Sequence, residues 1–225
     1  MVKKSNLLQQ MVLVNQLGMF FQRGYNFSKA CDLTAESNPE YANHLQLFRD
    51  QIVAGEYSRV FQTEGFHPAV QPFIDHGNEF GSLDLMLRNC AEYLMTEHIL
   101  QEANVPKNEK GIIQFYSAVP LLCSNPVFFN RAVERAHSFV ELQKDIIAYT
   151  IDSLRDGNPL SAAMHPLFDM YSHKEIVTIE FREKDLTLRN SLYIALFASL
   201  AKNLTQRYTT ESQLATGEPR QRLFF

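Results

Sequence analysis

Apolar residues recur at helical spacing along the first half of the chain, and glycine ends several of these runs. The stripe in residues 7–21 ends at Gly24, a residue type that readily takes the left-handed conformation of a helix cap. At Asn38-Pro39 a capping side chain precedes a proline at the first helical position, and that helix runs to Gly55. No segment alternates polar and apolar residues for long enough to predict a strand. We therefore predict an all-α fold.

Further helix starts complete this half of the chain. They are, in order, Ser28, Ser58, Pro68 and Ser82. The helix that begins at Ser82 is the longest and runs to Ala103. Residues 1–103 are thus predicted to form one antiparallel bundle of about six helices.

The second half of the sequence repeats the first at a nearly constant offset. Gly24 corresponds to Asn125, Gly55 to Gly157 and Leu83 to Leu186, so the offset changes by one residue at each step. Around the first of these anchors, Phe27 corresponds to Phe128 and Ala30 to Ala132. The pattern predicts an internal duplication, and hence two tandem, related helical bundles.

The duplication sets the predicted domain boundaries. Residues 104–111, NVPKNEKG, carry a proline and several charges and are predicted to be a linker. A second, divergent bundle occupies residues 112–208, in which residues 128–154 would be the fused counterpart of two helices of the first bundle. Residues 209–225 have no apolar period, which is typical of a flexible tail.

Composition excludes several classes of protein. A net charge of −4 argues against general affinity for nucleic acid or anionic lipid. Cys31, Cys90 and Cys123 are far apart, so the sequence predicts buried free thiols in a reducing compartment and no disulfide framework or zinc ribbon.

Neither a membrane span nor a signal peptide is predicted. The uncharged stretch at 111–130 is interrupted by polar residues and two prolines, which favours a core helix over a membrane span. The N-terminal apolar run is broken by glutamines and lacks a cleavage site.

One set of residues in the first half resembles a known family. Gly55, Ser58 and Phe66-His67-Pro68 are followed by Gly77, Gly81 and Leu83 at the start of the long helix. This order resembles the F domain of type II secretion and type IV pilus inner-membrane platform proteins. The resemblance covers residues 8–103 well and 113–206 faintly. It implies a six-helix bundle per repeat, no catalysis, no cofactor, and contacts with the assembly ATPase and neighbouring inner-membrane scaffold subunits.

The chain also departs from that family. Asn78 stands where the family usually has glutamate, the second copy lacks both glycines, and the membrane helices expected between and after the domains are absent. The resemblance therefore implies a non-enzymatic scaffold or adaptor in the cytoplasm, with peripheral association with the inner membrane and a homodimer as open alternatives. A stand-alone helical regulator unrelated to secretion is a further hypothesis.

The stretch GNEFGSL, residues 77–83, is predicted to be a helix–helix corner whose glycines permit close backbone packing or positive φ. As a second role, the corner is a candidate protein-interaction site with the residues Asp75, Asn78, Glu79, Gly81 and Leu83. Asp75, Glu79 and Asp84 could alternatively bind a hard cation such as calcium, and a solvated acidic edge is the simpler interpretation.

Glu134 and His137 give the alternative function, a helical metal-binding or oxidoreductase bundle. Their spacing places a carboxylate and an imidazole on one face of a helix, as in di-iron bundles. A complete site of that kind needs further carboxylates and a second such pair, which the sequence does not supply on helices. No phosphate-binding loop, nucleophile elbow or zinc-protease motif occurs, so we predict neither an enzyme nor a metal site.

Overall fold

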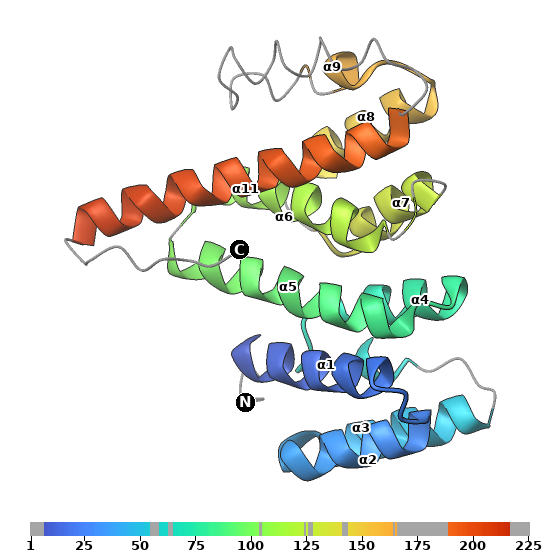
Figure 1. The fold of residues 1–225 in the computed structure, drawn as a ribbon. Coiled ribbons are helices and arrows are strands. Elements are labelled where there is room, and N and C mark those ends of the chain that lie inside the picture. Colours follow the sequence, from blue (N-terminus) through green and yellow to red (C-terminus); the bar gives the residue numbers. More distant parts are fainter. Residues whose placement is uncertain are drawn as a thin grey trace. The chain divides into compact units, whose positions relative to one another are not determined.

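The computed structural model describes residues 7–54, 59–62, 65–103, 105–123, 125, 128–140, 144–163, 165 and 189–216. Every regular element within these ranges is a helix, so the fold is all-α, as predicted (Figure 1). The elements are α1 Leu7–Gln22, α2 Phe27–Ser37, the 3-10 helix η1 Pro39–Tyr41, α3 Ala42–Val53, the 3-10 helix η2 Val60–Gln62, α4 Val70–Phe80, α5 Leu83–Glu102, α6 Lys107–Leu122, α7 Phe129–Phe139, α8 Lys144–Arg155, α9 Leu160–Ala163 and α11 Arg189–Thr216.

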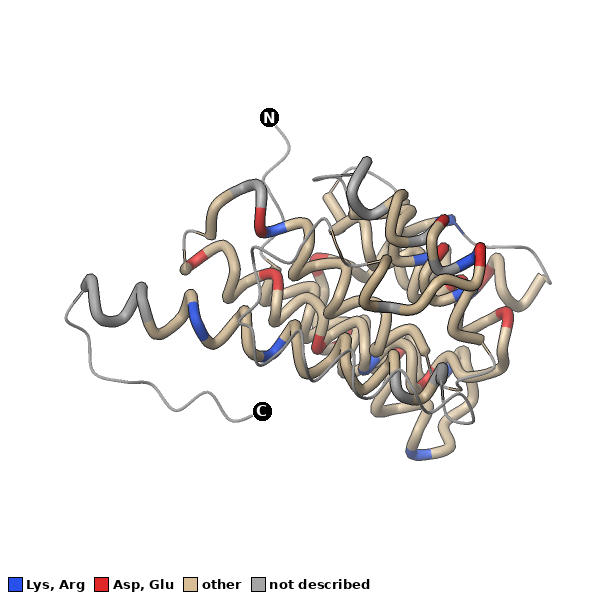
Figure 2. The backbone as a smooth tube through the Cα atoms, turned by 90° about the horizontal axis from the view of Figure 1, so that it is seen from above, with Lys and Arg blue, Asp and Glu red and all other residues tan. Residues whose placement is uncertain are grey.

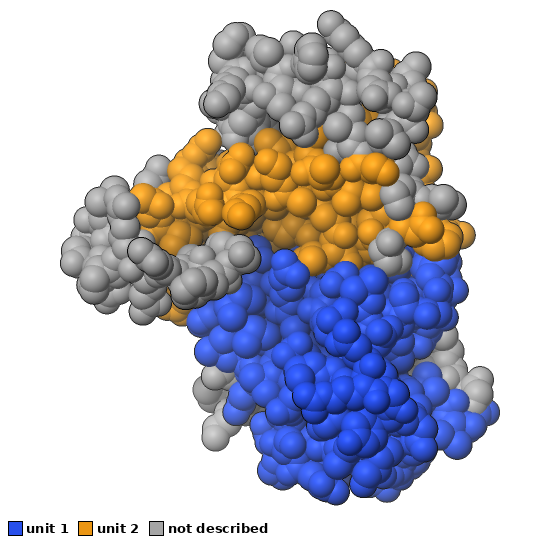
Figure 3. All heavy atoms as spheres, in the orientation of Figure 1, with its two compact units in different colours: residues 1–98 blue, residues 99–225 orange. Residues whose placement is uncertain are grey.

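The chain divides into two compact units, Met1–His98 and Ile99–Phe225 (Figure 3). This division falls inside α5, and not in the linker predicted at 104–111. Helix α6 begins at Lys107, so the last five residues of that predicted linker are helical. Lysine and glutamate are good helix formers, and the extended backbone of Pro106 precedes them as the N-cap. Helix α11 likewise continues to Thr216, into the predicted tail.

The helix starts in the first unit differ from the predicted ones by a few residues. Asn26, not Ser28, caps α2, because its side chain accepts a hydrogen bond of 2.9 Å from the Lys29 N–H. Asn38 makes no forward cap; its side-chain amide instead donates back to Thr34 O at 2.8 Å and across to Gln16 Oε1 at 2.6 Å. The sequence thus indicated polar capping residues near these helix starts, and the tertiary structure decides which partner each side chain binds.

Aromatic rings form the core around α2 and α3 in the first unit. Phe48 is fully buried, and its ring packs on Phe27 at 5.1 Å and on Phe61 at 5.0 Å between centroids. Phe61 in turn contacts Phe66, which lies against Tyr41. The core therefore joins α2, η1, α3 and η2 through ring contacts.

In the second unit, α6 packs along α11 and against α7 (Figure 1). Phe197 on α11 lies at the centre of this core, with its ring against Phe115, Tyr116 and Phe129. The predicted fused helix at 128–154 is wrong, because α7 ends at Phe139 and Val140 has extended backbone. Nothing in the local sequence marks this break, since residues 128–154 contain neither glycine nor proline.

The order and lengths of the helices recur between the two halves. Helices α1 and α6 each have 16 residues, α2 and α7 each have 11, and α3 and α8 each have 12. Ala30 and Ala132, at the fourth position of α2 and α7, are both fully buried. In this register Phe27 corresponds to Phe129 rather than to Phe128. Two members of the predicted pairs, Gly55 and Leu186, lie outside the described residues, as does the predicted helix start Ser58.

Within the described part of the chain, no helix combines the length and apolar character that crossing a membrane requires.

Candidate functional site

The corner between α4 and α5 uses its two glycines in different ways. Gly81 caps α4 in the left-handed conformation with φ of 66°, and the next N–H, of Ser82, donates to Gly77 O at 2.9 Å. Gly77 lets α5 approach closely, because a Cβ at this position would lie 2.7 Å from Leu83 Cα. The corner thus has both properties predicted for it, close packing at Gly77 and positive φ at Gly81.

The predicted interaction residues of this corner do not share one surface. Asn78, Glu79 and Gly81 are exposed, and Leu83 is half-buried against Gly77. Asp75 is only 7% exposed, and its carboxylate accepts a hydrogen bond of 2.7 Å from the Gln71 amide. The exposed part of the candidate site is therefore the end of α4 without Asp75.

The cation alternative at the corner gains no support. Among the described residues, no group of three or more His, Cys, Asp or Glu side chains is arranged to hold a metal ion. Asp75 is buried and bonded to Gln71, whereas Glu79 is exposed.

Glu134 is held by two arginines. Arg155 Nη2 lies 2.7 Å from one carboxylate oxygen and Arg131 Nη1 lies 3.2 Å from the other. The hydrogen bond from Arg155, helped by the one from Arg131, holds the pKa of Glu134 below its ordinary value although partial burial opposes this. Because both oxygens already bind cations, this carboxylate is suited to joining α7 to α8.

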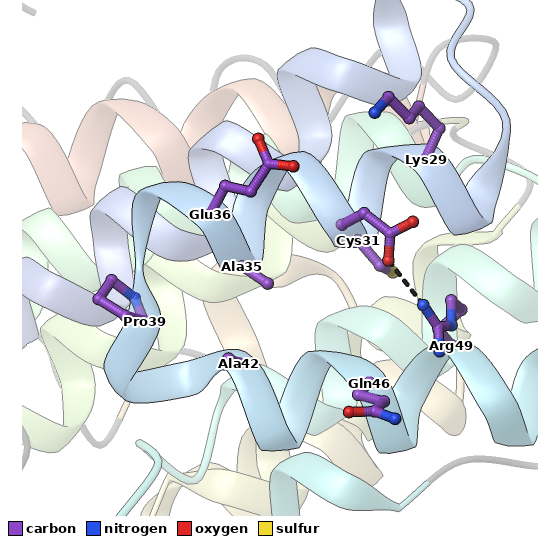
Figure 4. Close-up of a pocket in the computed structure, with 9 residues that line it drawn as sticks. Lys29, Cys31, Ala35, Glu36, Pro39, Ala42, Gln46 and Arg49 are labelled. Carbon is purple, nitrogen blue, oxygen red and sulfur yellow. Dashed lines mark hydrogen bonds and ion pairs between the residues drawn. The ribbon is translucent and has the colours of Figure 1, made fainter.

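An open groove of about 590 Å³ lies on the first unit between α2 and α3 (Figure 4). Small side chains line its floor, namely Cys31, Ala35 and Ala42, and the exposed Pro39 lies at one end (Figure 4). Polar side chains form its rim, namely Lys29, Asp32 and Glu36 from α2 and Gln46 and Arg49 from α3. Small residues on both helices leave this space between them.

Charges on the rim are divided between the two ends of the groove. Arg49 Nη1 binds Asp32 at 2.6 Å and Arg49 Nε binds Asp50 at 3.0 Å, and these hydrogen bonds raise the pKa of the guanidinium. Lys29 lies at the same end, and Glu36 lies towards the other end beside Pro39 (Figure 4). Neither Lys29 nor Glu36 forms an ion pair with a described residue. One cation and one anion are thus open to a partner.

Cys31 is an unreactive part of the groove floor. All three cysteines are free and buried, as predicted. Burial, and secondarily the Asp32 carboxylate, raise the pKa of the Cys31 thiol to about 12 although Arg49 opposes this. A thiol with so little thiolate is a poor nucleophile.

A buried polar cluster, not foreseen from the sequence, links α1, α5 and the segment before α4. Gln10, 2% exposed, donates to Gly65 O at 3.1 Å and accepts from the His67 N–H at 2.7 Å. Glu97, 1% exposed, accepts from Tyr93 Oη at 2.8 Å and lies 3.9 Å from His67 Nε2. Burial and the Glu97 carboxylate raise the pKa of Tyr93 well above its ordinary value.

The sequence feature that could have predicted this cluster is a polar residue at a position where the helix pattern expects an apolar one. Gln10 lies in register with the apolar residues Leu13, Val14 and Leu17 of α1, and Glu97 lies one turn after Tyr93 on α5. A polar side chain at such a position predicts a buried hydrogen-bond partner, without identifying it.

Basic and acidic residues are interspersed along the described helices (Figure 2). Recognition would therefore depend on individual charges, such as those of the groove rim, and less on a broad field of one sign.

These features define an all-helical protein with an open, charge-rimmed groove between two helices. The chain matches no protein-family model, no curated protein and no solved structure. The resemblance to platform proteins therefore stays a prediction from the sequence motifs.

Proposed function

We propose that the chain is a non-enzymatic helical scaffold or adaptor related to the platform proteins of type II secretion or type IV pilus assembly. It acts through protein contacts in the cytoplasm, at the periphery of the inner membrane. Its partners are the assembly ATPase or the cytoplasmic parts of inner-membrane scaffold subunits. The groove between α2 and α3 carries this proposal, because it combines an open apolar floor with charges that no described residue pairs.

The α4–α5 corner gives the proposal a second basis. The structure favours glycine at both glycine positions of the family-like motif. Gly81 has positive φ, and Gly77 has no room for a Cβ. The arginines on Glu134 favour a structural role for that carboxylate over the metal-binding alternative.

The test is direct binding of the full-length chain to the assembly ATPase and to the cytoplasmic part of a scaffold subunit from the same organism, by sedimentation velocity. We expect a complex with at least one of them and none with an unrelated cytosolic ATPase. The metal content of the purified chain is measured in parallel. No complex with either partner would contradict the proposal, and stoichiometric iron or manganese would favour the alternative based on Glu134 and His137.

A further inference from the structure

We propose that the groove between α2 and α3 receives a single amphipathic helix of a partner protein. The inserted face of that helix carries small or apolar side chains, and its flank carries an acidic and a basic residue about seven positions apart. This inference rests on the proposed function, and it assigns a site and a partner chemistry to it.

The floor of the groove suits a helix. Helix axes pack 8–10 Å apart, at the lower end of this range where the contacting side chains are small. Cys31 and Ala35 on α2 face the groove with Ala42 on α3, so a third helix can approach both walls closely. The volume of about 590 Å³ leaves room for the side chains of that helix.

The rim specifies the charges of the occupant. Lys29 and Glu36 are exposed, and their spacing of seven residues on α2 corresponds to about 10.5 Å along the helix axis. Arg49 is already bound by Asp32 and Asp50. A partner helix with one carboxylate and one cation at the same spacing satisfies both open charges at once.

The walls of the groove disfavour other occupants. Both walls are helices, whose backbone groups bond internally, so an extended strand finds no sheet edge to join. The lining side chains carry two positive charges, Lys29 and Arg49, and two negative charges, Asp32 and Glu36, so the groove offers no net positive charge to the phosphates of nucleic acid.

The test uses synthetic helical peptides of about 20 residues, long enough to be helical in water. The three peptides have the same Ala/Leu face and differ only at two flank positions seven residues apart. One peptide carries Glu and Lys at these positions, the second carries two Lys, and the third carries two Glu. Fluorescence anisotropy measures their binding to the full-length chain and to two variants, Lys29→Glu and Glu36→Lys. Arg23→Glu and Glu92→Lys make the same charge changes at exposed positions outside the groove and are the matched controls.

We expect the wild-type chain to bind the Glu/Lys peptide about two- to fivefold more tightly than either uniformly charged peptide, as for an exposed ion pair. Lys29→Glu should change the preference to the two-Lys peptide, and Glu36→Lys should change it to the two-Glu peptide. The controls should keep the wild-type preference. Both groove substitutions put a favourable charge near an end of α2, so the variants should stay folded, which circular dichroism checks.

Three results would overturn this site: no saturable binding of any peptide, an unchanged preference in both groove variants, or a changed preference in the controls. If the full-length chain still binds the ATPase or the scaffold subunit, such a result rejects the groove and leaves the proposed function standing. If those partners fail to bind while the peptide preferences change as expected, the groove stands and the platform-type role fails.

Discussion

At the scale of single residues, Gly77 and Gly81 differ in what an added methyl group would meet. At Gly77 the Cβ would lie 2.7 Å from Leu83 Cα, which is backbone and cannot rotate away. At Gly81 no atom lies within 4 Å of the Cβ position, but φ of 66° disfavours a side chain. One position is thus restricted by space and the other by backbone conformation.

We therefore expect Gly77→Ala to lower the free energy of unfolding by about 1–3 kcal/mol through overpacking. Gly81→Ala should lower it by about 1 kcal/mol, and Gly81→Asn by less, because asparagine tolerates the left-handed region. Urea unfolding of the three variants measures these differences. A Gly77→Ala variant as stable as the wild type would show that α4 and α5 are not in close contact.

The buried thiols predict a pH dependence of stability. Burial raises the pKa of Cys31 to about 12 and that of Cys123 to about 11, from an ordinary value of 9.0. Between about pH 9 and pH 11 the folded chain keeps thiol protons that the unfolded chain loses. The free energy of unfolding should therefore fall as pH rises, by about 1.4 kcal/mol per pH unit for each thiol.

Urea unfolding between pH 8 and pH 11 tests this, with Cys31→Ala as the comparison. The free energy of unfolding of that variant should decline less steeply with pH, and the difference in slope is the contribution of the Cys31 thiol. Titratable groups that both proteins share contribute equally to the two slopes and cancel in the difference. Parallel pH profiles for the two proteins would count against burial as the cause.

At the scale of elements, Gln10 ties α1 to the segment before α4. Its amide is the hydrogen-bond partner of the Gly65 carbonyl and of the His67 N–H. We expect Gln10→Ala to lower the free energy of unfolding by about 1–3 kcal/mol, because the substitution removes two hydrogen bonds to part-buried backbone groups. Gln9→Ala, at the neighbouring exposed position, should change stability little.

Hydrogen exchange of the His67 amide distinguishes the two variants. Exchange should speed up in Gln10→Ala and stay unchanged in Gln9→Ala. Equal protection of the His67 amide in both would mean that other contacts hold this segment.

The elements also show which sequence signals were reliable. Gly24, Gly65, Gly81 and Gly157 all have positive φ, a conformation that few other residues adopt, so glycine marked turns well. Charge and proline marked the linker poorly, because the lysines and glutamate after Pro106 form the first turn of α6. The break at Val140 had no local signal, since no glycine or proline occurs there.

At the scale of the whole molecule, the all-α fold followed from periodicity, which is a local property. The recurring helix lengths did not, because they depend on the break between α7 and α8, which the sequence did not predict. The groove did not, because it needs α2 and α3 to pack with their small residues on the same side. Asp75 was placed on the surface by its charge, but its bond to Gln71 allows it to be buried. Local pattern therefore predicted the elements, and the candidate site depends on contacts between them.

The hydrogen bonds of Gln10 have a consequence for the order of folding. The two bonds join residues that are separated by 55 and 57 positions in the sequence. Forming them therefore requires closing a long loop, which costs conformational entropy. Helices α2 and α3, adjacent in sequence, can pair without that loop. We therefore expect the α2–α3 pair to form early, and the segment around Gly65 and His67 to become ordered only once α1 has docked.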